Sequence, residues 1–292
     1  MSRNRPIGYA FIAPALIHLL VFALVPMGYA FYVSLHKWQI FKPEKAMVGL
    51  DNYSYTLQED AFRNAMWNSL KFALMSVPLG MFVALLVAIL VNQKLRGVTV
   101  FRTLFYIPSI ASGVAIAMLW IYVYLPDSGL INMTMTAFGL KSIDFLNRPE
   151  WAMWALAFMS VWVGLGPRMV LFLAGLIGIP QSLYEAAELD GAGKLRAFWN
   201  VTLPMLIPTT LFVMVTSTIG AMQVFTPVYM MTKGGPEEST DVVGYHIYTE
   251  AWMNFNTGLA SAKSFILLAV IVAISVVQFK MTKSRMEGYS AG

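Results

Sequence analysis

Long uncharged apolar runs, separated by polar connectors, dominate the pattern of this chain. About 20 apolar residues in a helix span a bilayer core, and in hydrocarbon only helices or closed barrels pair every backbone group. The pattern therefore predicts an all-α integral membrane protein, with six transmembrane helices in a single transmembrane domain over residues 1–292. The six runs cover about residues 7–35, 72–91, 103–125, 151–179, 205–231 and 258–279.

The composition places the chain in lipid. Hydrophobic residues make up 58% of the sequence and charged residues 12%, and the mean hydropathy is +0.64, whereas about 25% of an ordinary soluble domain is charged. The first run follows two arginines, as a secretory signal does, but it is far longer than a signal core of about 7 to 15 residues. We therefore expect it to remain as a span. The absence of cysteine excludes disulfides and thiol chemistry.

Basic residues indicate the orientation. If the N-terminus is inside, the cytosolic and outer segments contain nearly equal numbers of Lys and Arg residues. The cytosolic segments, however, are short and dense in these residues. The positive-inside rule weighs basic residues close to the spans, so we expect both termini in the cytosol. No basic block with interleaved aromatic residues indicates nucleic-acid binding. The cytosolic basic residues would be Arg3, Arg5, Lys94, Arg96, Arg102, Lys194, Arg196, Lys280, Lys283 and Arg285.

The polar stretch 180–204 lies in the cytosol in this topology. Ser182–Glu185 has the S-x-x-E form of a capping box, and Gly191 suits the left-handed position that ends a helix. We expect a second short helix over about residues 194–200, closed by Leu203-Pro204. Any cytosolic connector can be a capped helix, so these signals alone assign no role.

The spacing of residues within this stretch is more specific. Glu185-Ala186-Ala187, Gly191 and Val201-Thr202-Leu203-Pro204 resemble, almost position by position, the EAA loop of permease subunits from binding-protein-dependent, ATP-driven (ABC) importers. Val201 stands where that family usually has Ile. The resemblance implies the type I ABC importer permease fold, with a cytosolic coupling helix that docks on an ATPase. The residues that it assigns to coupling are Glu185, Ala186, Ala187, Asp190, Gly191, Leu203 and Pro204.

Three further segments look like the carbohydrate-importer branch, the permeases of maltose and glycerol-phosphate type. They are Gly49–Tyr53, Thr103–Pro108, and Thr232–Pro236 with Ser239-Thr240. The resemblance implies a permease subunit for a sugar, oligosaccharide or polyol derivative in a bacterial or archaeal cytoplasmic membrane. The implied partners are membrane lipid, a second and usually different permease, two ATPases that bind the ATP and Mg²⁺, and an extracytoplasmic binding protein. The alternatives are a non-sugar permease of this type or a self-sufficient secondary transporter.

Carrying over the sugar-contacting stretch of the maltose permease gives candidate substrate positions. Two of the four positions in the fourth run have little capacity for hydrogen bonding, which argues against maltose itself. Trp162 and Gln223 are neighbouring candidates, although Trp162 suits a structural role better than stacking on sugar. Packing of small residues between helices explains the positions in the fifth run equally well. The carried-over positions are Ser160, Val163, Gly164 and Pro167 in the fourth run, and Ser217, Ala221 and Val224 in the fifth.

Arg168 interrupts the fourth run about 11 residues before its end, or some 16 Å at 1.5 Å per residue. A charge at that depth faces protein or a water-filled cavity. Pairing with a backbone carbonyl or with an acid of a partner subunit is the simpler interpretation. The alternative is a cation lining the pathway, which would favour an anionic substrate such as a uronic-acid oligosaccharide or a phosphorylated polyol.

The sequence does not indicate an enzyme. It has no H-E-x-x-H, no G-x-S-x-G and no cysteine nucleophile, and no P-loop that would bind ATP. We therefore expect ATP hydrolysis in separate subunits and no cofactor in this chain. No acid falls within a predicted span, which argues against an ion-coupled secondary transporter.

Overall fold

The computed structural model describes the backbone of residues 5–93 and 97–290 and the side chains of residues 11–93 and 97–282. The described chain is mostly helical, and two units are distinguished: Met1–Arg63 with His246–Leu268, and Asn64–Tyr245 with Ala269–Gly292. Of the basic residues used for orientation, Arg3, Lys94 and Arg96 lie outside the described residues. The side chains of Arg5, Lys283 and Arg285 also lie outside them.

The first unit begins with a continuous apolar helix. It is formed by α1 (Arg5–Leu19), the π-helical turn η1 (Leu20–Leu24) and α2 (Val25–Ser34), and corresponds to the first predicted span. Two short antiparallel strands follow, β1 (His36–Lys37) and β2 (Ala46–Met47), and then α3 (Asp51–Gln58). Asn52 of α3 donates hydrogen bonds to the carbonyls of Ser34 and His36, at 2.7 and 3.0 Å. These bonds fix α3 against the junction of α2 and β1.

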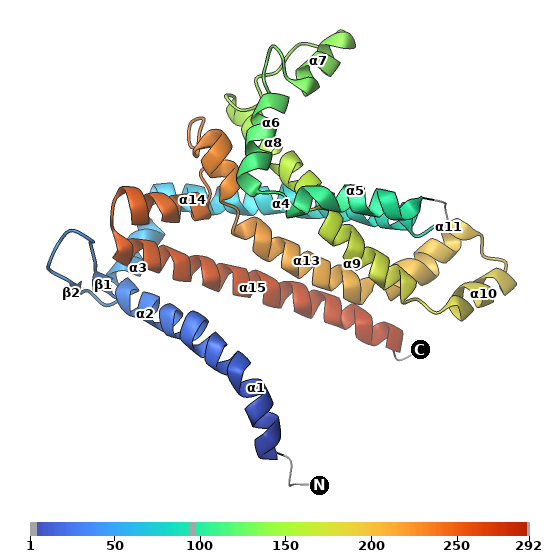
Figure 1. Cartoon of the computed structure of the whole chain (residues 1–292), viewed down its shortest axis with the longest axis horizontal. Helices are drawn as coiled ribbons and strands as arrows, with labels where there is room; N and C mark the ends of the chain where they lie inside the picture. Colours follow the sequence, from blue (N-terminus) through green and yellow to red (C-terminus); the bar gives the residue numbers. More distant parts are fainter. Residues whose placement is uncertain (1–4, 94–96, 291–292) are drawn as a thin grey trace. The chain divides into compact units, whose positions relative to one another are not determined.

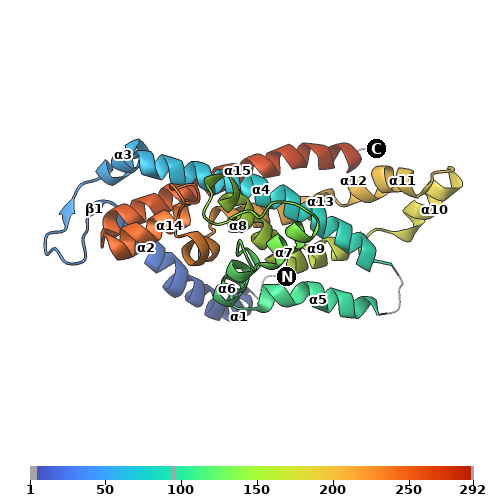
Figure 2. The same ribbon diagram turned by 90° about the horizontal axis from the view of Figure 1, so that it is seen from above.

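Most of the remaining helices belong to the second unit, and α4, α14 and α15 each continue from one unit into the other (Figures 1 and 2). The turn η4 (Thr249–Met253) lies in the first unit. In chain order the other elements are α4 (Asp60–Val91), α5 (Val98–Ile110), α6 (Gly113–Val123), α7 (Leu130–Ala137), α8 (Pro149–Val163), α9 (Leu165–Ile177), α10 (Gln181–Leu189), α11 (Lys194–Ala197), η2 (Phe198–Thr202), α12 (Leu203–Met205), α13 (Ile207–Met222), η3 (Val228–Thr232), α14 (Val243–Tyr248) and α15 (Thr257–Ser290).

Two predicted spans, the third and the fourth, are broken helices in the structure, and a third bend lies at the start of the fifth span. The helices α5 and α6 differ in direction by 101°, α8 and α9 by 50°, and the segment 194–205 and α13 by 62°. Pro167 and Pro208 contribute to the last two breaks, because proline has no N–H for the carbonyl four residues earlier. Ala111 ends α5 in an extended conformation, with φ −76° and ψ 155°. If each bent pair is one span, the described residues contain up to six crossings, as predicted.

The helix bounds also differ from the prediction at several ends. The second span is part of α4, which begins at Asp60, and the sixth is part of α15, which continues to Ser290. The fifth was expected to reach Met231, but α13 ends at Met222. The polar first turns of α4 continue the helix beyond its apolar run, so hydropathy alone does not give the helix ends.

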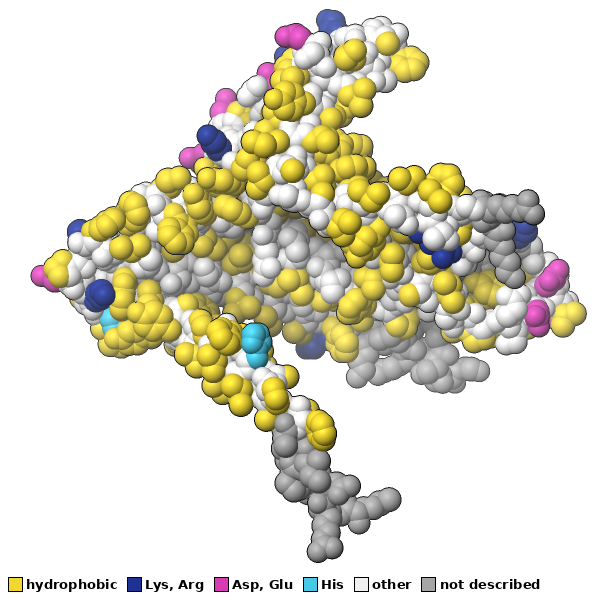
Figure 3. All heavy atoms as spheres, in the orientation of Figure 1, with side chains coloured by type: hydrophobic (Ala, Val, Ile, Leu, Met, Phe, Trp, Pro, Cys, Tyr) yellow, Lys and Arg dark blue, Asp and Glu magenta, His cyan; other side chains and the backbone are white. Residues whose placement is uncertain are grey.

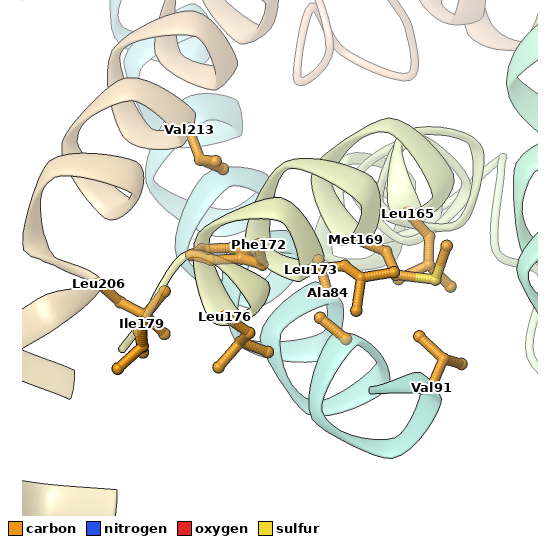
Figure 4. Packing of buried hydrophobic residues seen from close by; sticks show 11 residues of the cluster. Ala84, Val91, Leu165, Met169, Phe172, Leu173, Leu176, Ile179, Leu206 and Val213 are labelled. Atoms are coloured by element: carbon orange, nitrogen blue, oxygen red, sulfur yellow. The ribbon is translucent and has the colours of Figure 1, made fainter. Parts of the chain in front are cut away.

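Apolar side chains of α9 form the centre of the core of the second unit (Figure 4). Met169 and Phe172 are buried in one cluster with Ala84 and Ala88 of α4. Small residues allow helices to approach closely. Gly166 likewise allows α9 to approach α5 closely, because a Cβ at this position would lie 2.6 Å from the backbone oxygen of Phe105.

Much of the apolar surface faces outward. Figure 3 shows hydrophobic side chains over much of the visible face, with few acidic side chains among them. Phe22 and Leu74, for example, are 71% and 69% exposed. A soluble protein rarely exposes contiguous apolar patches of this kind, so this surface fits contact with lipid or with other membrane helices.

Candidate functional site

A cavity of about 410 Å³ lies within the second unit, among α4, α6, α8, α9 and α13. It collects side chains that are far apart in the sequence. Of the substrate-pathway candidates, it brings together Ser160, Gly164, Arg168 and Ser217. The carried-over positions Val163, Pro167, Ala221 and Val224 line it as well.

Two candidates do not line this cavity. Trp162 packs against Trp120, with ring centroids 5.6 Å apart, which fits its expected structural role. Gln223 follows the end of α13 and is exposed. The cavity also includes Ser76 and Thr226, which were not predicted. No motif marks these two residues in the sequence, and only the packing of their segments places them at the cavity.

Arg168 is the charged residue of the cavity wall. Its Nε donates a hydrogen bond of 3.1 Å to Ser217 Oγ, across from α9 to α13. Its Nη1 is buried and has no hydrogen-bond partner. Two glycines make room for the guanidinium, since a Cβ at Gly80 or Gly164 would lie 2.5 or 2.8 Å from Nη1. No lining residue is acidic.

The polar stretch after α9 forms the predicted pair of short helices, at one end of the second unit (Figures 1 and 2). Gly191 has a φ of +75°, as predicted for the residue that ends the first helix. Its N–H donates to the oxygen of Glu188 at 3.0 Å, and the N–H of Ala192 donates to that of Ala187 at 2.9 Å. This is the Schellman arrangement, which satisfies carbonyls at the end of α10.

Two details of this stretch differ from the prediction. The capping box is wrong: α10 begins at Gln181 after Pro180, so Ser182 lies inside the helix, and no side chain caps it. The second helix was expected to close at Leu203-Pro204, but α11, η2 and α12 continue to Met205. Proline is tolerated in the first turn of a helix, which explains why Pro204 begins α12 instead of ending the segment.

The two halves of this stretch, called here the coupling loop (residues 180–204), are joined by a polar contact. Tyr184 Oη and Thr202 Oγ1 lie 2.9 Å apart, within hydrogen-bond distance. Glu185, Ala186, Asp190 and Gly191 are exposed, whereas Ala187, Leu203 and Pro204 are partly buried. Leu189 is 89% exposed, so the loop presents both charge and an apolar side chain.

The Gly-Gly-Pro connector after η3 is held against α4. Asn68 Nδ2 donates to the backbone oxygens of Glu238 and Asp241, each at 2.9 Å. Gly234 has a φ of +84°, and a Cβ there would lie 3.0 Å from the ring of Tyr245. The turn therefore requires glycine at residue 234 for its backbone conformation and for space. Burial raises the pKa of Tyr245, and the nearby Asp241 raises it further.

A second polar cluster, in the first unit, was not predicted. The side chain of Lys263 is 0% exposed, and its Nζ lies 2.9 Å from Glu59 Oε2 and 2.9 Å from Glu250 Oε2. His246 Nε2 is 3.1 Å from the same nitrogen. The two carboxylates and the imidazole are close enough to bind a metal ion, but Lys263 already supplies a positive charge between them. We interpret this Lys263 cluster as a set of buried ion pairs.

The family model for "Binding-protein-dependent transport system inner membrane component" matches residues 76–283. The chain belongs to this family, and is therefore an inner-membrane transport component. Residues 76–283 include the cavity-forming parts of α8, α9 and α13 and the coupling loop. The predicted family and fold class are thereby confirmed.

Relatives over nearly the whole length agree with this assignment. The probable ABC transporter permease protein YesP of Bacillus subtilis (strain 168) is 37% identical over 294 residues, which cover 96% of this chain and 93% of YesP. The sn-glycerol-3-phosphate transport system permease protein UgpA of Escherichia coli (strain UTI89 / UPEC) is 32% identical over 285 residues. These residues cover 97% of this chain and 96% of UgpA.

A solved structure has the same fold. It is a bacterial ABC transporter involved in the import of the acidic polysaccharide alginate, with a TM-score of 0.81 and 24% identity over 95% of both chains. The similarity extends over the broken helices, so these belong to the fold.

Proposed function

We propose that the protein is the permease subunit of an ATP-driven importer that moves a carbohydrate through the cavity of the second unit. The observation that carries this proposal is the convergence of Ser160, Ser217 and Arg168 on one cavity within a largely apolar helical unit. Hydroxyl groups and a guanidinium can replace the hydrogen bonds to water that a sugar loses when it enters the cavity, whereas apolar side chains cannot. The import functions named for the relative UgpA and for the alginate transporter support the same substrate class.

The coupling loop supports partnership with two ATPase subunits, which would bind the ATP and Mg²⁺. Its exposed Glu185, Asp190 and Leu189 offer charge and apolar contact to a soluble protein. An extracytoplasmic binding protein and a second, different permease would complete the importer. We propose that both termini and this loop face the cytosol of a bacterial or archaeal cell. The chain itself then needs no catalytic group.

Charge reversal in the coupling loop tests this function. We expect Glu185→Lys, assayed in the complete importer in proteoliposomes, to reduce ATP-dependent uptake and the amount of ATPase that co-purifies. Asp127→Lys is the matched control, because Asp127 is exposed but lies outside the loop. The chain without its partners should show neither ATPase activity nor ion-driven uptake. Normal uptake and co-purification with Glu185→Lys would refute the coupling role.

The substrate class has its own test. Calorimetry on the cognate binding protein, with a panel of sugars, polyols, amino acids and inorganic ions, would identify the solute that the importer accepts. A carbohydrate ligand is the expected result. Binding of only amino acids or inorganic ions would leave an importer of this type for a non-sugar solute and refute the carbohydrate assignment.

A further inference from the structure

The charge of Arg168 is not balanced by an acid at the cavity. No residue lining the cavity is acidic, and no ion pair with Arg168 occurs in the described part of the chain. Its hydrogen-bond partner is the neutral Ser217. A buried charge is retained only where it is paired, hydrated or needed for function. The positive charge that lines this cavity therefore has no acidic counterpart among the described residues.

The surroundings of Arg168 fix where this charge points. Ser217 Oγ accepts a hydrogen bond of 3.1 Å from Nε, and Gly80 and Gly164 leave space for Nη1, which a larger residue at either position would displace. Two glycines and a hydroxyl on a third helix therefore lie next to the guanidinium in this position. A snorkelling arginine would extend toward the membrane surface, and its guanidinium would not contact Ser217, Gly80 and Gly164.

We propose that Arg168, positioned by Ser217, is a specificity-determining residue that selects carbohydrates bearing a carboxylate or phosphate group. This inference rests on the proposed function and specifies its substrate class. A guanidinium binds these two groups through paired, charge-assisted hydrogen bonds that are about twice as strong as neutral ones. A neutral sugar would meet the same hydroxyls at Ser160 and Thr216, which also line the cavity, but it would leave the charge unpaired.

The absence of cysteine makes a direct test available. Thr216→Cys places a single thiol in the cavity of this chain, and its rate of reaction with a maleimide, measured in the complete importer in nanodiscs, reports occupancy. The probes are charge-matched pairs: digalacturonate and galactobiose, glucose 6-phosphate and glucose, and sn-glycerol 3-phosphate and glycerol. In at least one pair we expect the charged member to protect the thiol at about 10- to 100-fold lower concentration than the neutral one.

Variants at Arg168 then assign the preference. Arg168→Gln should abolish the difference between the paired probes, and Arg168→Lys should retain part of it, because the charge remains but the fork of donors is lost. Arg102→Gln is the matched control, since Arg102 donates to the carbonyl of Val91 and does not line the cavity. The anionic preference is the readout that a merely structural arginine would not change.

Three results would overturn the proposal: equal protection by the members of every pair, no protection by any charged probe, or an unchanged preference with Arg168→Gln. A fall in assembly of the importer without a change in preference would place an acid of a neighbouring subunit opposite Arg168, and counts against the proposal too. The Glu185→Lys uptake assay does not depend on the cavity charge. It therefore separates failure of this inference from failure of the proposed function.

Discussion

Replacing Lys263 by Met tests how strongly the Lys263 cluster stabilises the first unit. Met keeps most of the length of the side chain but removes the charge that contacts Glu59 and Glu250. Breaking a buried ion pair by removing one partner costs about 3–5 kcal/mol, because the remaining charge stays buried and unpaired. The side chains of Glu59 and Glu250 are 21% and 12% exposed, so some hydration remains. We therefore expect a loss near the lower limit, about 3 kcal/mol.

An exposed ion pair at the start of α4 provides the control. Arg63 and Asp60 have side chains that are 62% and 91% exposed, and such pairs contribute about 0–1 kcal/mol. The free energy of unfolding can be measured by titrating the purified chain with SDS in mixed micelles and following tryptophan fluorescence. Lys263→Met should lower it by several times as much as Arg63→Ala. Equal losses would show that burial of the cluster does not determine its contribution.

A combined variant separates lost attraction from unpaired charge. Adding Glu59→Gln and Glu250→Gln to Lys263→Met removes the two carboxylates that would otherwise repel each other. Replacing a whole buried network by neutral groups is often nearly neutral for stability, so we expect the combined variant to be more stable than Lys263→Met alone. A combined variant that is less stable would refute this explanation of the cluster.

Three further substitutions test backbone geometry and packing in the second unit. Gly191→Val should destabilise the end of α10 by about 1–2 kcal/mol, because φ is +75° at this residue. It should also reduce co-purification of the ATPase. The control Gly193→Val, at a φ of −68°, should have neither effect. Asn132→Leu should lower the free energy of unfolding by about 2–4 kcal/mol, since it removes partly buried hydrogen bonds to two carbonyls and one amide. Detergent unfolding without a change would contradict this. Gly166→Ala should lower it by about 1–3 kcal/mol by forcing α9 away from α5, and an unshifted unfolding curve would refute the close contact.

The number and type of the membrane segments could be predicted because the driving force is simple. A run of about 20 apolar residues is a property that any window of sequence reveals, and α4 and α15 contain such runs. The bends could not be read in the same way. Pro78 lies inside the unbroken α4, whereas Pro167 and Pro208 follow breaks, so proline alone does not predict where a helix divides.

The candidate site was predicted in part, because resemblance gives positions in the sequence while packing gives positions in space. Ser160 and Ser217 were expected together and are together. Gln223 adjoins the carried-over position Val224, but α13 ends at Met222, and Gln223 does not line the cavity. The Lys263 cluster joins segments whose pairing depends entirely on tertiary structure, so no local signal could have indicated it.

The breaks in the helices and the position of the cavity have one physical explanation. Interrupted helices leave backbone groups without partners, and in a membrane this is tolerated only where those groups are buried in protein or line a cavity. Gly113 follows the break between α5 and α6, Gly164 lies at the break between α8 and α9, and Val224 follows the end of α13; all three line the cavity. Two helix breaks and the end of α13 thus meet at one cavity within an apolar unit. Arg168 lies one turn after Gly164, so the residue at the bend and the charged residue line the same cavity.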